Sequence, residues 1–146
     1  MKFWQKFWQL VSRKDLVFGT LLFVVVIAMG VYETCNKITV TFSETAVDIS
    51  TSKYSMNIPY ELVESAELTP LPEAGQVIDG TDDMAARTGH WKNSQWGEYY
   101  ICADLNSPDC VAVRLKDGRL FAFSRRSAEV TRELYELLRS GLALSE

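Results

Sequence analysis

The sequence is poor in the residues that most often build catalytic and metal centres. It holds one histidine, His90, and three cysteines, Cys35, Cys102 and Cys110, without a CxxC pair. A zinc site of the usual cysteine and histidine type is not expected, because such a site needs four of these ligands close together. No nucleophile elbow is present, so His90 is the one residue on which a hydrolase hypothesis could rest. We expect no catalytic residue.

The sequence also lacks a basic stripe. Residues 1–33 carry a net charge of +2, which leaves −6 on the rest of the chain, since the total is −4. An acidic domain repels nucleic acid and anionic lipid surfaces, so neither is an expected partner of the domain. Asp79, Asp82 and Asp83 lack the alternating spacing and the closing glutamate of a calcium loop. We interpret them as a plain acidic loop and expect no metal and no cofactor.

Charge is absent from residues 16–32, LVFGTLLFVVVIAMGVY. A helix of that length spans about 25 Å, slightly less than the roughly 30 Å hydrocarbon core of a bilayer. Flanking residues and local thinning of the bilayer make up the difference. The sequence therefore predicts one transmembrane helix over 16–33, which contacts the lipid bilayer through 16–32.

Residues 1–15 form a basic leader with a tandem KFWQ repeat. On a helix, the four-residue spacing stacks Trp4 near Trp8, and such aromatic side chains settle at the headgroup level. We predict an amphipathic leader in which Trp4 and Trp8 anchor one end of the span and Tyr32 the other. The alternative is a solvated charged leader.

The orientation follows from the basic residues. Four of them precede the span and only Lys37 follows it closely, which predicts a cytoplasmic N-terminus and an extracytoplasmic domain in the cell membrane. A cleaved signal peptide is the alternative, with Ala28 and Gly30 as small residues at the cleavage site. The long leader argues against it, and the domain lies outside in both cases.

From Lys37 onward the pattern is that of β-strands. Alternating apolar residues predict strands near 38–42, 47–50 and 56–58, and a turn leads into another strand over 60–68. Residues 70–97 predict a long irregular loop, functional or mobile, with a short strand at Gln76–Ile78 or near Trp91 as the alternative. Three strands follow at 99–103, 111–115 and 120–123, the last two joined by the hairpin signal Asp117-Gly118.

The chain closes with an amphipathic helix. Ser127 is the predicted N-cap, and Gly141 fits a helix stop. The helix has one apolar face at helical spacing, made of Val130, Leu134, Leu137, Leu138 and Leu142.

This order resembles the bacterial pleckstrin-homology-like domains of small membrane-anchored proteins. The matching pieces are Ile58-Pro59-Tyr60-Glu61-Leu62-Val63, the glycine-rich middle, the strand 111–115, the turn Asp117-Gly118-Arg119 and the closing helix. The resemblance implies a mainly β domain over 37–142, a bent antiparallel barrel of about seven strands with a C-terminal helix at one open end. It implies no activity, because that fold serves lipid, peptide and protein binding alike. The first turn, Ser43-Glu44-Thr45-Ala46, is acidic, which departs from phosphoinositide recognition.

Two pairs of residues are candidate binding residues. Trp91 and Trp96, with Tyr99 and Tyr100 nearby, form either an exposed aromatic patch for a partner or part of the core. Arg125 and Arg126 precede the last helix, where they either meet an anionic group of a partner or form a solvated pair.

A disulfide between Cys102 and Cys110 is also predicted. They lie on two predicted strands joined by residues 103–109, and cysteines that face each other across an antiparallel pair come within bonding range. An extracytoplasmic domain permits oxidation. The alternative is two small buried thiols, and Cys35 stays unpaired near the membrane.

These features predict a non-enzymatic, membrane-tethered binding or scaffold module. Its expected partner is another envelope protein, contacted through the 70–97 loop or through an exposed sheet edge. The alternative function is a carrier of a small ligand or lipid in the barrel interior or mouth.

Overall fold

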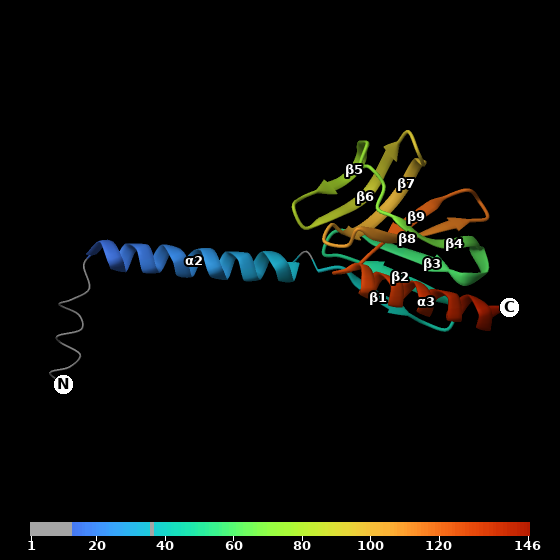
Figure 1. The fold of residues 1–146 in the computed structure, drawn as a ribbon, viewed down its shortest axis with the longest axis horizontal. Coiled ribbons are helices and arrows are strands. Elements are labelled where there is room, and N and C mark those ends of the chain that lie inside the picture. Colours follow the sequence, from blue (N-terminus) through green and yellow to red (C-terminus); the bar gives the residue numbers. More distant parts are fainter. Residues whose placement is uncertain (1–12, 36) are drawn as a thin grey trace. The chain divides into compact units, whose positions relative to one another are not determined.

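The computed structural model describes residues 13–35 and 37–146, and the chain divides into two compact units, Met1–Cys35 and Asn36–Glu146. The first unit contains helix α2, Arg13–Cys35 (Figure 1). Its described side chains from Val17 to Ile27 are almost all apolar and are exposed around the whole helix. Among the residues that the structure describes, no helix is long and apolar enough to cross a membrane.

The predicted interfacial anchors lie outside what the structure describes. Trp4 and Trp8 precede the described residues, and the side chains of Tyr32 and Cys35 are not among the described ones.

The second unit is mainly β, with one C-terminal helix, as the sequence predicts. Three antiparallel strands form a small sheet in the order β1-β2-β3: β1 (Thr39–Phe42), β2 (Ala46–Ser50) and β3 (Ser55–Pro59). Their alternation of apolar and polar residues places one face inward, with Ile49 opposite Val40 on one side and Met56 on the other. The three strands predicted near 38–58 are confirmed.

The other strands form a six-stranded sheet in the order β4-β8-β9-β7-β6-β5. A short 3₁₀ turn, η1 (Tyr60–Leu62), leads into it from β3, in agreement with the predicted turn and strand over 60–68. The strands are β4 (Val63–Pro70), β5 (Gln76–Asp82), β6 (Ala86–Asn93), β7 (Gly97–Asp104), β8 (Asp109–Leu115) and β9 (Leu120–Phe123). Strands β4 and β5 are the two open edges of this sheet.

The prediction of a long irregular loop over 70–97 was wrong. Residues 76–93 form the antiparallel hairpin β5–β6, and β7 begins at Gly97 (Figure 1). Two features hid these strands. Most side chains of β5 are exposed, so the apolar alternation is weak, and a bulge between Val77 and Asp79 breaks the period of two.

The expectation of about seven strands, all antiparallel, was also wrong. The described residues contain nine strands, and β7 pairs with β9 in parallel, with Ile101 opposite Ala122. Strand β9 reads Leu-Phe-Ala-Phe and is buried throughout. A strand that is apolar on both faces is stabilised at the centre of a sheet, so β9 lies between β7 and β8.

Helix α3 (Ala128–Ser145) completes the domain. The Ser127 side chain accepts a hydrogen bond from the Val130 N–H at 3.3 Å, which confirms the predicted N-cap. Leu134 and Leu138 are buried against the β-strands. Gly141 does not end the helix as predicted, because α3 continues to Ser145.

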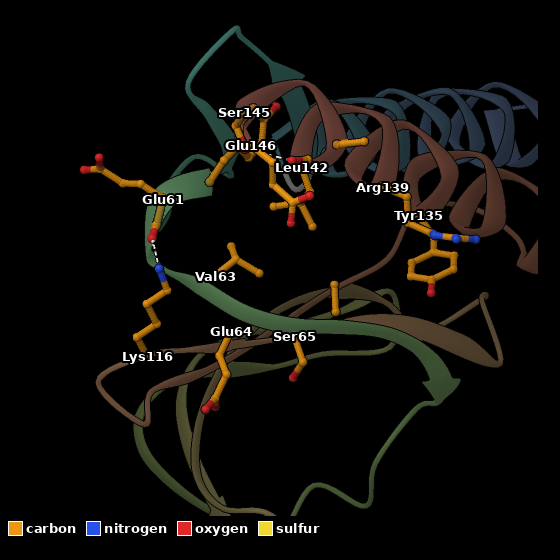
Figure 2. A pocket seen from close by; sticks show the side chains of 13 residues that line it. Glu61, Val63, Glu64, Ser65, Lys116, Tyr135, Arg139, Leu142, Ser145 and Glu146 are labelled. Atoms are coloured by element: carbon orange, nitrogen blue, oxygen red, sulfur yellow. Dashed lines mark hydrogen bonds between the residues drawn. The ribbon is translucent and has the colours of Figure 1, made fainter.

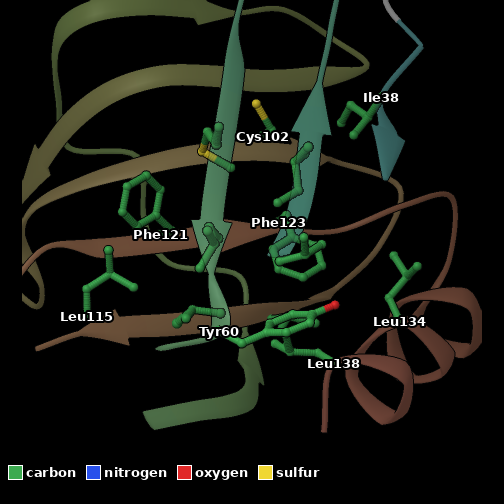
Figure 3. Packing of buried hydrophobic residues seen from close by; sticks show 14 of the residues in the cluster. Ile38, Tyr60, Cys102, Leu115, Phe121, Phe123, Leu134 and Leu138 are labelled. Atoms are coloured by element: carbon green, nitrogen blue, oxygen red, sulfur yellow. The ribbon is translucent and has the colours of Figure 1, made fainter. Parts of the chain in front are cut away.

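The core occupies both faces of the six-stranded sheet. On one face, side chains from both sheets and from α3 pack together (Figure 3). Ile49, Phe123 and Leu138 belong to this cluster and all have 0% exposure. On the other face, Trp91, Tyr99 and their neighbours are covered by the segment 71–75, which contributes Leu71 and Ala74. Burial on both faces holds the six strands in one rigid sheet.

Candidate functional site

A groove lies between the open edge of β4 and the C-terminal half of α3 (Figure 2). Its volume is about 590 Å³. We call it the β4–α3 groove, and it is lined by Tyr60, Glu61, Val63, Glu64, Ser65, Ala66, Lys116, Tyr135, Arg139, Leu142, Ala143, Ser145 and Glu146. These residues come from η1, β4, the β8–β9 turn and α3, so the groove exists only once the domain has folded.

The backbone of β4 has unpaired groups that face away from β8. The Leu71 N–H donates to Pro108 O at 2.8 Å on the β8 side. Because backbone groups alternate in direction along a strand, Glu67 points to β8, whereas Ala66 and Leu68 point to the open side. Pro70 also belongs to the open-facing set, which suits a residue without an N–H. An extended chain could therefore pair with β4 at Ala66 and Leu68.

The floor of the groove is apolar and half-buried. Val63, Ala66 and Leu142 all pack against the main core and line the groove. Gly141 lets α3 approach η1 closely, since a Cβ at this position would lie 2.9 Å from Tyr60 Cζ. The Tyr60 hydroxyl donates to Ser43 O at 3.0 Å. These contacts fix the width of the groove on the η1 side.

The rim of the groove is charged. Glu61, Glu64 and Lys116 are exposed, and Lys116 Nζ donates to the backbone oxygen of Glu61 at 2.8 Å, as Figure 2 shows. The Arg139 guanidinium lies 5.8 Å from the centre of the Tyr135 ring. An apolar floor with a polar, hydrated rim is the usual anatomy of a binding surface. The β4–α3 groove has both features.

The two predicted partner-binding tryptophans are not equally accessible. Trp91 is 5% exposed, and its Nε1–H donates to Thr88 O at 2.9 Å. It belongs to the core, which is the second of the two interpretations that the sequence left open for this residue. Trp96 is half-buried and packs edge-on against the Tyr99 ring at 5.4 Å. Neither tryptophan lines the β4–α3 groove.

Arg125 and Arg126 lie in the connection between β9 and α3. Their backbones are tied down, because the Arg125 N–H donates to Thr131 Oγ1 and the Arg126 N–H to Asp104 Oδ2. A carboxylate therefore already sits at this end of the helix, and Ser127 caps it. These surroundings favour the interpretation of Arg125 and Arg126 as a solvated pair.

The disulfide prediction rested on a hairpin that does not form. Strands β7 and β8 are separated by β9, and both Cys102 and Cys110 are free, buried thiols. Cys102 belongs to the core on one face of the sheet and Cys110 to the core on the other. Burial raises the pKa of each thiol to about 12. Both thiols are therefore protonated and unreactive at neutral pH.

His90 is held as a packed aromatic ring. It stacks on Tyr100 with ring centres 4.4 Å apart, and its Nε2 lies 3.2 Å from Glu98 Oε2. These two contacts hold the His90 ring in place on β6.

The acidic residues Asp79, Asp82 and Asp83 were predicted to form a loop, but they lie along β5 and in the β5–β6 turn. Asp79 accepts from the Tyr54 hydroxyl, Asp82 lies near Arg87, and Asp83 accepts from the backbone of Ala85. Within the described part of the chain, no group of three or more histidine, cysteine or carboxylate side chains could hold a metal ion.

Comparison with known proteins gives no match to a family model, to a curated protein or to a solved structure. The groove itself was not predicted from the sequence. Its one local signal is Pro70 at the end of a strand, which indicates an edge strand. The approach of α3 to that edge has no local signal, because it depends on the packing of Gly141 and Tyr60.

Proposed function

We propose that this chain is a single-pass membrane protein whose β domain is a non-enzymatic binding or scaffold module. The domain binds an extended segment of another envelope protein in the β4–α3 groove, by adding a strand to β4. The observation that carries the proposal is the open edge of β4 at Ala66 and Leu68, beside an apolar floor. Strand addition gives affinity through backbone hydrogen bonds and specificity through alternate side chains.

The membrane anchor is supported by the uncharged run 16–32 and by its place within α2. A helix that is apolar on every side is stable either in a protein core or in lipid. The basic residues before the run support an N-terminus in the cytoplasm and a domain outside. The two sheets and the C-terminal helix support the resemblance to pleckstrin-homology-like domains, from which the parallel β7–β9 pair departs.

The carrier function has less support. The space between the two sheets holds fully buried side chains, including Ile58, Val113 and Phe123. A ligand there would have to displace them, and a well-packed core resists such a change.

A displayed library of random decapeptides, selected on the full chain in nanodiscs, tests the proposal. We expect extended peptides to be enriched on the wild type and lost with Ala66→Pro, which removes the open-facing N–H and keeps the bonds to β8. Met84→Pro is the matched control, because Met84 is 97% exposed at the second position of the β5–β6 turn. Equal enrichment on wild type and Ala66→Pro would reject strand addition at β4.

A further inference from the structure

The acidic and basic side chains that line the β4–α3 groove differ in the contacts they make. Glu61, Glu64 and Glu146 line the groove with exposed side chains, and none of them forms a salt bridge within the described residues. The two cations there have contacts of their own. Lys116 donates to a backbone oxygen, and Arg139 lies over the Tyr135 ring. Both cations keep their charge, so three carboxylates and two cations leave the lining of the groove with a net charge of −1.

The end of α3 adds to this negative field. The last turn of the helix contains no basic residue, and Leu142 and Ser145 of that turn line the groove. The last carbonyl groups of a helix carry a partial negative charge, which attracts cations. The whole chain beyond residue 33 has a net charge of −6, so the surrounding field has the same sign.

A strand added to β4 would present its side chains alternately to two environments. One set would face the apolar floor at Val63, Ala66 and Leu142. The other set would lie beside the exposed carboxylates of Glu64 and Glu67. Opposite charges on neighbouring strands stabilise the pairing, and like charges oppose it.

We propose that the segment bound in the β4–α3 groove is cationic, with lysine or arginine alternating with small apolar residues. This inference rests on the proposed function and names the chemistry of its partner. Lys116 and Arg139 in the lining, and Arg114 on β8 opposite Ser65, are the cations that limit where the basic side chains of the partner can lie.

Three capped synthetic peptides of the same length test the charge: a lysine–valine repeat, a serine–valine repeat and a glutamate–valine repeat. Binding to the full chain in nanodiscs of neutral lipid is measured by fluorescence anisotropy at low and high salt. We expect the lysine peptide to bind about tenfold more tightly than the serine peptide, with the difference shrinking at high salt. The glutamate peptide should bind most weakly.

Two variants separate the groove from the general charge of the domain. Glu64→Gln should weaken binding of the lysine peptide several-fold and leave the serine peptide unchanged, whereas Glu44→Gln in the β1–β2 turn should change neither. An equal loss with Glu44→Gln would overturn the inference, because attraction would then come from net charge alone. If all three peptides bind equally and lose binding with Ala66→Pro, the cationic partner is wrong and strand addition stands. If no peptide loses binding with Ala66→Pro, both the cationic partner and strand addition at β4 are wrong.

Discussion

The two open edges of the six-stranded sheet differ although they belong to one sheet. Strand β4 has half-buried apolar side chains at Val63, Ala66 and Leu68, and α3 lies beside it. Strand β5 is exposed along most of its length, with Val77 and Ile78 about half exposed. Each edge has a bulge, and each has carboxylates nearby.

The difference teaches that an unpaired edge is not by itself a binding site. A bulge and charged side chains are the usual means by which an edge strand avoids pairing with other chains. No helix lies beside β5 among the described residues, so the bulge and the charges of that edge act alone. On β4 the helix adds an apolar floor and a second wall, so that an incoming chain buries surface as well as making hydrogen bonds.

The largest expected effect is the difference in stability between proline substitutions at two neighbouring positions of β4. Glu67→Pro removes an N–H that points to β8 and should lower the free energy of unfolding by about 3 kcal/mol. Ala66→Pro should lower it by less than about 1 kcal/mol, because its N–H faces the open side. Urea unfolding of the two variants measures both values. Similar losses would mean that the alternation along β4 is assigned wrongly.

A smaller effect is expected at the opposite edge. Gly89 on β6 has a φ of 104°, and a Cβ there would collide with the Asp79 carbonyl oxygen on β5. Gly89→Ala should cost about 2 kcal/mol and open β5 locally. Hydrogen exchange should become faster in β5 and β6 and stay unchanged in β4 and β8.

Gly97→Ala is the control for the glycine at β6. Gly97 also has a positive φ, 70°, but no atom lies within 4 Å of its Cβ position. Only the backbone strain of about 1 kcal/mol remains in this variant. If Gly97→Ala opened β5 as strongly as Gly89→Ala, the close contact between β5 and β6 would not be the cause.

The last effect is absent at neutral pH and appears only in alkali: a pH dependence that distinguishes the two halves of the sheet. The pKa of each buried thiol is raised from about 9 to about 12. The stabilisation from the neutral thiols is complete below pH 9 and is lost as the pH rises toward 12, since the unfolded chain releases its protons first. Each thiol should contribute a slope of about 1.4 kcal/mol per pH unit at most.

Single variants assign this slope to its two sources. Cys110 on β8 lies opposite Thr69 of β4, and Cys102 on β7 lies opposite Thr88 of β6. Cys110→Ala therefore removes the thiol on the β4 side of the sheet, and Cys102→Ala removes the thiol on the β6 side. Unfolding measured between pH 8 and pH 11 should show about half the wild-type slope in each variant. An unchanged slope in both would show that other groups, such as the buried Tyr60 and Tyr99, dominate.

The sequence predicted the elements whose signals are local. The alternation at Val47 and Ile49, the turn Asp117-Gly118 and the N-cap Ser127 each lie within a few residues of the structure they specify. The hairpin over 76–93 was predicted only in part, as a short strand at Gln76–Ile78 or near Trp91, because its exposed side chains leave no apolar period. Its close strand contact at Gly89 appears in the sequence only as one more glycine.

The sequence by itself determined a mainly β domain with an amphipathic closing helix, because apolar periodicity and capping act over a few residues. Only the tertiary structure decided that β9 separates Cys102 from Cys110, that Trp91 is buried, and that α3 lies beside the open edge of β4. Strand order and helix docking depend on how whole faces are buried against one another. No local pattern records that outcome, because residues far apart in the chain share in the same core.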